Sequence, residues 1–168
     1  MTVPPSFNRQ GPEAAGFTGF IPFDEVPAAP TPADPGVYAV VRDPDVPPEY
    51  LDCSVAGRFK GRNPTVGSVV LARKWVDTAT VVYIGKATSL SGRLRAYASI
   101  GRGNPVGHWG GRYVWQLADH DRLLVAWLAL PHGTDPFDAE HALLDAFTAE
   151  YGALPFANIR RGRTPRSL

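Results

Sequence analysis

Two charged side chains fall within the apolar faces of two predicted helices. On a helical wheel with 3.6 residues per turn, Glu140 lies in the middle of an apolar stripe formed by Phe137, Leu143, Leu144, Phe147 and Tyr151. Arg93 lies within the inward stripe of an earlier helix, formed by Leu90, Ala96, Tyr97 and Ile100. An unpaired carboxylate on a buried face costs several kcal/mol, so Glu140 must meet a cation, a metal ion or the water of a cleft.

These two charges allow two interpretations. In the first, Arg93 and Glu140 pair with each other as a buried salt bridge in an otherwise unrelated small α+β protein. In the second, both side chains line one cleft that binds a substrate. Tripeptide motifs on two predicted strands favour the second interpretation.

The elements that must position these residues follow from periodicity and from turn signals. Apolar runs predict strands over 36–42, 69–75 and 80–84, and a hairpin of strands 112–117 and 122–130 across 118–121. Helices are predicted over 88–100, ended by Gly101, and from Pro136 to about Tyr151, with Asp135 as N-cap and Gly152 as stop. This order predicts an α+β fold, close to an α/β sandwich, with a small mixed or antiparallel central sheet flanked by helices.

The length of 168 residues is enough for one domain with a core of its own. Residues 1–15 lack periodicity and are expected to form a flexible arm, with a single domain over 16–168. Residues 43–77 contain no convincing period and are predicted to be a long loop or insertion. Seventeen glycines and seventeen prolines also indicate long loops between few regular elements.

Composition excludes several classes of protein. A single cysteine, Cys53, excludes an internal disulfide and a cysteine-based zinc cage. The longest apolar stretch, residues 123–130, is far shorter than the ~20 residues of a membrane helix. No basic-then-apolar leader opens the chain, so we expect a soluble, cytoplasmic protein.

Charge is unevenly distributed along the chain. Residues 1–50 hold seven acidic side chains and two arginines, whereas residues 86–112 hold five basic side chains and no acid. A predicted basic tail, residues 160–168, adds Arg160, Arg161, Arg163 and Arg166. Such segregation is typical of a face that binds a polyanion, and it also fits a solvated arginine-rich surface.

Two tripeptides and the residues after them resemble the GIY-YIG nuclease family. Gly36-Val37-Tyr38 and Tyr83-Ile84-Gly85 are similar to the family's two signature tripeptides. The positions that follow match, in order and spacing, the family's catalytic helix, glutamate and asparagine, in particular those of the nuclease subunit of bacterial nucleotide excision repair. They are Lys86, Arg93, Tyr97, Glu140 and Asn158, so the resemblance covers residues 36–159.

The chain also departs from the family pattern. The family places its tripeptides close together on adjacent hairpin strands, whereas Tyr38 and Tyr83 are 45 residues apart. The segment 43–77 must therefore hang off that hairpin or extend it. Val37 stands where the family has isoleucine, which a strand tolerates. No zinc finger, helix-turn-helix or second nuclease domain is visible in the sequence.

The resemblance implies a divalent-metal-dependent endonuclease that hydrolyses DNA, expected to be double-stranded, with Mg²⁺ or Mn²⁺ as cofactor. Glu140 would be the metal ligand, because Mg²⁺ favours one or two carboxylates completed by water. Arg93, with its planar fork of donors, suits a bidentate grip on the scissile phosphate. The setting, whether DNA repair, restriction, mobility or phage defence, stays open, and so does a catalytically inactive module that binds nucleic acid or protein.

The resemblance implies further roles. Tyr38 would act as general base or orient the water, and Tyr83 and Tyr97 would contact the phosphate and the waters around the metal. Lys86 would hold a phosphate or lower the pKa of a tyrosine, and Asn158 would be a strut. His108 is a further candidate, because some family members carry a functional histidine in the loop after the catalytic helix.

The remaining charged and aromatic residues divide into two groups. Contacts to DNA phosphates are expected from Arg58, Lys60 and Arg62 in the insertion and from Arg95, Arg102 and Arg112. Structural or exposed positions are expected for His120, His132 and His141, turn-forming roles for Asp119 and Asp121, and core strand positions for Trp75, Trp115 and Trp127.

Overall fold

The computed structural model of the protein describes residues 2–8 and 10–159. The predicted basic tail, residues 160–168, lies outside the described residues. The strands are β1 (Thr18–Pro22), β2 (Gly36–Val41), β3 (Val81–Ala87) and β4 (Leu124–Ala129). The helices are α1 (Gly11–Ala14), α2 (Ser68–Ala72), α3 (Leu90–Gly101) and α4 (Pro136–Tyr151), with 3₁₀ turns η1 (Phe59–Gly61), η2 (Arg112–Gln116) and η3 (His120–Arg122). No helix in this part of the chain combines the length and apolarity needed to cross a membrane.

A four-stranded antiparallel sheet forms the centre of the molecule. The strand order is β1-β4-β2-β3, so β2 is central and β3 is an edge strand. The two strands that carry the tripeptides pair directly, with Tyr38 opposite Gly85 and Val37 opposite Lys86. The predicted α+β fold with a small antiparallel sheet is confirmed.

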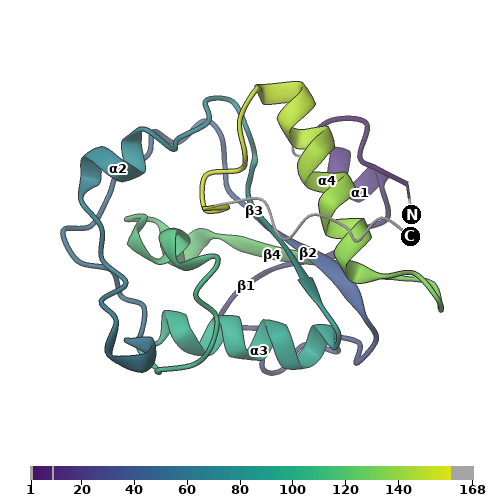
Figure 1. The fold of residues 1–168 in the computed structure, drawn as a ribbon, viewed down its shortest axis with the longest axis horizontal. Helices are drawn as coiled ribbons and strands as arrows, with labels where there is room; N and C mark the ends of the chain where they lie inside the picture. Colours follow the sequence, from purple (N-terminus) through teal and green to yellow (C-terminus); the bar gives the residue numbers. More distant parts are fainter. Residues whose placement is uncertain (1, 9, 160–168) are drawn as a thin grey trace.

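Helices α3 and α4 cover opposite faces of this sheet (Figure 1). Side chains alternate between the faces of a strand, and β2 therefore contributes to two separate cores. Tyr38 and Val40 pack in the core that contains the α3 side chains Leu90, Leu94 and Tyr97. Val37 and Ala39 pack in the core that contains the α4 side chains Leu143, Leu144 and Phe147.

Local signals place the ends of both long helices. The Ser89 side chain caps α3 by accepting from the Gly92 amide, and Asp135 caps α4 by accepting from the Phe137 amide at 2.8 Å. Gly152 ends α4 in the left-handed conformation at φ 73°. The predicted bounds of α4 are confirmed, and α3 runs only one or two residues away from its predicted bounds.

Two predicted strands are wrong. Residues 69–72 belong to helix α2 and residues 73–75 follow it, and Val69 and Val70 on that helix are exposed. Residues 112–117 form η2, so the predicted hairpin is absent and β4 pairs instead with β1 and β2. Four consecutive residues of η2 are buried. A short apolar run therefore fits a short buried helix as well as a strand.

The expectation of a flexible arm over residues 1–15 is wrong around Phe7. This ring is 2% exposed and packs edge-to-face on Phe147 of α4, with ring centres 5.1 Å apart. The Phe7 amide donates to the Glu150 carboxylate at 3.1 Å, and its carbonyl accepts from the Thr80 amide. The Phe7 ring is thus part of the core beside α4, although its segment shows no periodicity.

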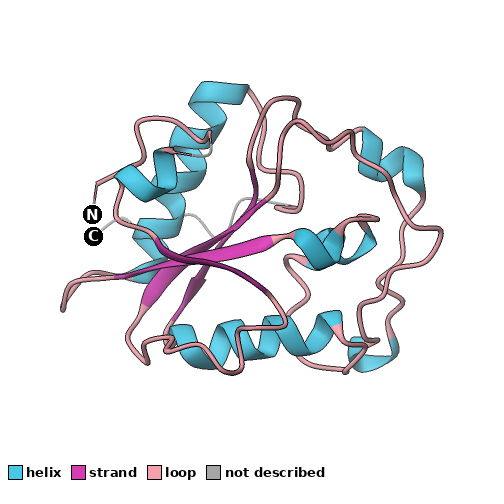
Figure 2. Cartoon of the chain, turned by 180° about the vertical axis from the view of Figure 1, so that it is seen from behind, coloured by secondary structure: helices cyan, strands magenta, loops and turns pink. Residues whose placement is uncertain are grey.

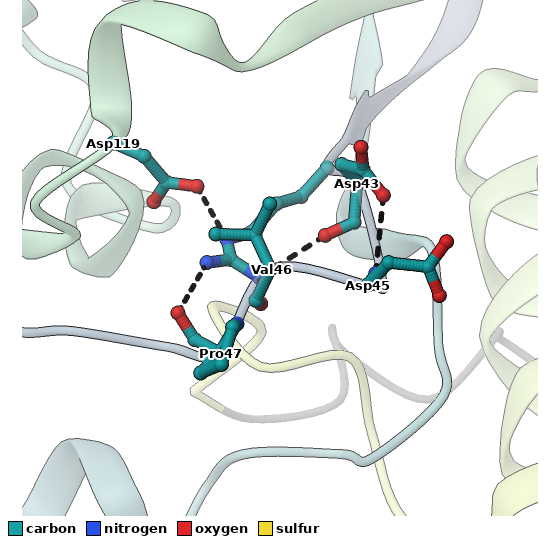
Figure 3. A network of polar contacts seen from close by, with 6 residues as sticks. Asp43, Asp45, Val46, Pro47 and Asp119 are labelled. Atoms are coloured by element: carbon teal, nitrogen blue, oxygen red, sulfur yellow. Dashed lines mark hydrogen bonds and ion pairs between the residues drawn. The ribbon is translucent and has the colours of Figure 1, made fainter.

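The 43–77 insertion runs to one side of the sheet, beyond the end of α3, in both views of the chain (Figures 1 and 2). Its first turn is held by Arg42, whose side chain is buried. The guanidinium donates to the carbonyls of Val46 and Pro47 at 2.6 and 3.0 Å and pairs with Asp119 at 2.8 Å (Figure 3). Asp119 lies in the turn before η3, as predicted, and is in addition the ion-pair partner of a buried arginine.

Gln116 holds the middle of the insertion. Its side chain is 1% exposed and donates to the carbonyls of Leu51 and Val66 at 3.0 and 2.8 Å. Its carbonyl accepts from the Val66 amide at 3.0 Å. One amide side chain thus satisfies three backbone groups of the insertion, as buried polar groups require.

Replacing Gln116 by leucine should loosen the insertion. The substitution leaves three backbone groups of Leu51 and Val66 without their partner, which should lower the free energy of unfolding by about 2–4 kcal/mol. Urea unfolding measures this loss, and amide exchange over residues 50–67 should speed up. Asn63→Ala, which removes an exposed bond to the Thr65 amide, is the control and should cost less than about 1 kcal/mol. A Gln116→Leu protein as stable as the native one would contradict the assignment.

Candidate active site

A groove lies where α3, the β3 edge and α4 approach one another. It consists of two adjoining cavities of about 240 and 470 Å³. Both cavities are lined by Tyr83, Lys86, Trp109, Gly110 and Glu140. The smaller one adds Tyr38, Arg93, Gly107 and His108, and the larger one adds Arg62, Arg112, Leu144, Asn158 and Ile159. The structure thus brings most of the predicted site residues into one groove.

A buried hydrogen bond joins Tyr38 and His108 at the bottom of the smaller cavity. The Tyr38 hydroxyl and His108 Nε2 are 2.6 Å apart, and both residues are buried. The imidazole stacks on the Tyr97 ring, with ring centres 3.7 Å apart and planes within 5°. The loop 107–111 is thereby fixed against α3.

Tyr97 lies behind the groove. Its ring is 0% exposed, and its hydroxyl donates to the Gly111 carbonyl at 2.8 Å. The expectation that Tyr97 contacts the phosphate and the waters around the metal does not match this position. Tyr97 belongs to the apolar stripe of α3 and therefore points into the core, where its ring packs against His108.

Gly85 allows Tyr38 to occupy its position. A Cβ atom at residue 85 would lie 2.5 Å from Tyr38 Cζ, closer than any real contact. The two residues are cross-strand partners, so the tyrosine ring folds over the bare backbone of the facing strand. The second tripeptide therefore ends in glycine because any larger residue at position 85 would clash with the Tyr38 ring.

Burial keeps His108 neutral. Its pKa falls from 6.5 to about 3, chiefly through desolvation and then through the charge of Arg93. Burial raises the pKa of Tyr38 well above 10 and that of Tyr83 to about 12. At neutral pH the Tyr38 phenol therefore donates, and His108 Nε2 accepts.

Glu140 lies in the inward stripe of α4 and is 8% exposed, as the helical wheel predicts. Its carboxylate pairs with the ammonium of Lys86, which also lies over the Phe137 ring at 4.7 Å. Among the described residues no ion pair joins Glu140 to Arg93, so the salt bridge of the first interpretation is wrong. Lys86 is the partner because it points from β3 to the α4 side of the sheet.

Arg93 is exposed, whereas the wheel predicts an inward position. The buried side of α3 is formed by Leu90, Leu94, Tyr97, Ala98 and Ile100. Arg93 lies one turn from the N-terminus of α3 and lines the smaller cavity there. Its guanidinium is therefore free to meet a ligand at the mouth of the groove.

Asn158 completes the free edge of β3. Its side chain accepts from the Ile84 amide at 2.9 Å and donates to the Ile84 carbonyl at 2.8 Å, while the Ala157 amide donates to Val82. The segment after α4 thus satisfies backbone groups that an edge strand leaves open. This position agrees with the predicted role of Asn158 as a strut.

The predicted DNA-contacting residues divide between the groove and other surfaces. Arg62 and Arg112 line the larger cavity, and the Arg112 guanidinium lies 4.6 Å from the centre of the Trp109 ring. Arg58, Lys60, Arg95 and Arg102 are exposed and line neither cavity. The sequence interpretation missed Trp109, whose only signal is an aromatic side chain between glycines.

The other chemical candidates lie away from the groove. Trp115 and Trp127 are buried, as predicted, although Trp115 belongs to η2 and not to a strand. Trp75 follows α2 and packs edge-to-face on Phe156. The remaining residues line neither cavity: His120, Asp121, His132 and His141.

The groove can hold a hard divalent cation only through few protein ligands. Glu140 is the one carboxylate that lines the two cavities, and residues 2–8 and 10–159 contain no cluster of three or more metal-ligating side chains. Mg²⁺ is commonly bound through one or two carboxylates, with water and substrate phosphate completing the shell. The donor set therefore fits Mg²⁺ or Mn²⁺.

Comparison of the chain with protein-family models, with curated proteins and with solved structures found no match. The chemistry open to the groove therefore follows from its own residues. A buried phenol–imidazole pair, four cationic side chains and one carboxylate are among the groups that line it.

The neutral state of His108 should make folding stability depend on pH. Its folded pKa lies below the unfolded value of 6.5, so its contribution is complete above pH 6.5 and is lost as the pH falls toward 3. Native protein should lose about 2 kcal/mol more than His108→Asn protein between pH 7.5 and 5. Urea unfolding at both pH values measures the difference. His132→Asn, at an exposed position, is the control; a native-like pH dependence in His108→Asn would contradict the buried neutral imidazole.

Proposed function

We propose that this protein is a divalent-metal-dependent endonuclease of the GIY-YIG type that hydrolyses phosphodiester bonds of double-stranded DNA. The observation that carries the proposal is the Tyr38–His108 hydrogen bond at the bottom of a groove whose rim holds Arg93, Lys86 and Glu140. A proton acceptor beside a phenol, cations for a phosphate and a carboxylate for a metal are the groups that this hydrolysis needs.

Arg93 binds the scissile phosphate. The guanidinium is exposed, lines the smaller cavity, and has no ion-pair partner among the described residues. Its planar donors match two phosphate oxygens. The charge stabilises the phosphorane-like transition state, in which negative charge on these oxygens increases.

Tyr38 and His108 move the proton of the attacking water. The Tyr38 oxygen takes up this proton while the tyrosine passes its own proton to His108 Nε2, 2.6 Å away. The phenol is thus never required as a free phenolate, which its raised pKa disfavours. Phosphate on Arg93 offsets the charge that lowers the pKa of His108, so the imidazole becomes a better acceptor when DNA is bound.

Glu140 would hold the metal ion, which supplies Lewis-acid stabilisation of the phosphate and of the leaving 3′ oxygen. Asn158 positions the β3 backbone between Tyr83 and Lys86 through its two hydrogen bonds to Ile84. Tyr83, whose hydroxyl remains protonated, can donate to a phosphate oxygen in the groove.

The larger cavity continues the path of the DNA backbone. Arg62 comes from the insertion and Arg112 from η2, and both side chains line this cavity beside Trp109. Phosphates next to the cut would meet these arginines, which position the duplex without reading sequence. The expected cytoplasmic location and the biological setting stay predictions.

Removal of charge at the groove should abolish cleavage. Arg93→Ala and Glu140→Gln should each lower the rate of plasmid nicking in Mg²⁺ by at least about a hundredfold, because each removes a charge at the reacting centre. In EDTA, binding of duplex to Glu140→Gln should be maintained or tightened, because the substitution removes a negative charge near the phosphates. Gel assays with Mg²⁺, Mn²⁺ or EDTA measure cleavage, and filter binding measures affinity.

Matched controls remove the same kinds of charge outside the groove. Asp138→Asn removes an exposed carboxylate from α4, and Arg122→Ala removes an exposed guanidinium from η3; neither residue lines the groove. Both should cleave like the native protein. Full activity in Arg93→Ala or Glu140→Gln would end the assignment, and duplex binding without cleavage in the native protein would favour the inactive module.

The basic side chains of the insertion should bind phosphates. Replacement of Arg58, Lys60 and Arg62 by alanine should weaken duplex binding equally across sequences and reduce the slope of log affinity against log salt by about 0.9 for each phosphate that is no longer neutralised. Melting temperature should change little, because all three side chains are exposed. An unchanged salt slope would show that the DNA path runs elsewhere, over Arg95, Arg102 and Arg112.

A further inference from the structure

The carboxylate that would hold the metal ion is already engaged. Lys86 Nζ forms an ion pair with Glu140 Oε2, and no other hydrogen bond or ion pair of the Glu140 carboxylate is found in the described part of the chain. The Glu140 side chain is 11% exposed and that of Lys86 34% exposed. The pair therefore lies at the wall of the groove and can open toward its interior.

The Lys86 ammonium and a divalent cation cannot both bind Glu140 Oε2. Both are drawn to the same carboxylate oxygens, and at a few ångströms from each other they repel across a partly buried medium. Phe137 below Lys86, at 4.7 Å, favours the paired position through its ring face. A metal ion can bind Glu140 Oε2 only when Lys86 leaves that oxygen.

We propose that Lys86 occupies the cation site of Glu140 in the free protein and is exchanged for the metal ion when a phosphate enters the groove. The inference rests on the proposed function and assigns to Lys86 two alternating partners, the Glu140 carboxylate and a phosphate. Lys86 also lines the smaller cavity with Arg93, so the side chain that leaves Glu140 can reach a phosphate oxygen in the same groove.

This exchange couples the two ligands. DNA phosphate attracts Lys86, which frees Glu140 and raises the affinity for the metal ion; by linkage, the metal ion raises the affinity for DNA by the same factor. In the free protein the charges of Lys86 and Glu140 balance each other. After DNA is released, Lys86 therefore pairs with Glu140 again. Metal binding in the absence of substrate is thereby disfavoured.

Mn²⁺ binding without DNA tests the exchange directly. Lys86→Met should bind Mn²⁺ at least about fivefold more tightly than the native protein, because the competing ion pair is removed. Lys86→Arg keeps the charge and should bind like the native protein. Arg95→Met removes an exposed charge of α3 outside the groove and should change the affinity less than twofold. Electron paramagnetic resonance of free Mn²⁺ measures all four proteins.

A double variant locates the effect. Glu140→Gln should lose the Mn²⁺ site, and Lys86→Met combined with Glu140→Gln should show no gain. Equal or weaker Mn²⁺ binding in Lys86→Met than in the native protein overturns the exchange, as does an equal gain in Arg95→Met. Melting temperatures measured beside the binding verify that the half-exposed methionine is accommodated.

Cleavage separates this inference from the proposed function. With DNA kept well below saturation, the Mg²⁺ midpoint of cleavage reports the metal affinity of the DNA-free protein, and in Lys86→Met it should fall several-fold. The maximal rate should also fall, because residue 86 no longer holds a phosphate. Native protein that cleaves DNA, with an unchanged Mg²⁺ midpoint in Lys86→Met, overturns the exchange alone. A native protein that binds Mn²⁺ in the predicted pattern but never cleaves overturns the nuclease proposal and leaves the exchange standing.

Discussion

The antiparallel register of β2 and β3 is the constraint on which the groove depends. Tyr38 opposite Gly85 and Val37 opposite Lys86 send the tyrosine to the α3 side and the lysine to the α4 side of the sheet. A slip of one residue would exchange these faces, with a lysine in the α3 core. Because β3 is an edge strand, groups from both faces can meet around it.

Burial divides the groove into a dry bottom and a charged rim. Tyr38, Tyr97 and His108 are almost inaccessible, so their hydrogen bond and ring stack are fixed and the imidazole stays neutral. Lys86 and Arg93 keep their charged ends near solvent, where the desolvation cost is small. The proposed hydrolysis uses the bottom for proton movement and the rim for phosphate and metal.

Capping residues and helical periodicity predicted α4 correctly. Short apolar runs led to two strands that the structure does not contain. Asp135, Gly152 and the spacing of apolar residues place α4 within its observed bounds. The runs at 69–75 and 112–117 satisfy a strand pattern equally well, yet they lie outside the sheet as α2 and η2. Their conformation depends on contacts such as those of Gln116 with the insertion, which no periodicity reveals.

The sequence by itself determined which residues alternate across the tripeptide strands and that Glu140 belongs to an apolar helix face, because both follow from backbone periods of a few residues. Only the tertiary structure decided that Glu140 meets Lys86 and not Arg93, and that Tyr38 meets His108. These partners are far apart along the chain, 54 residues for Lys86 and Glu140 and 70 for Tyr38 and His108. Their pairing is set by how the helices pack on the sheet, and local periodicity contains no information on that packing.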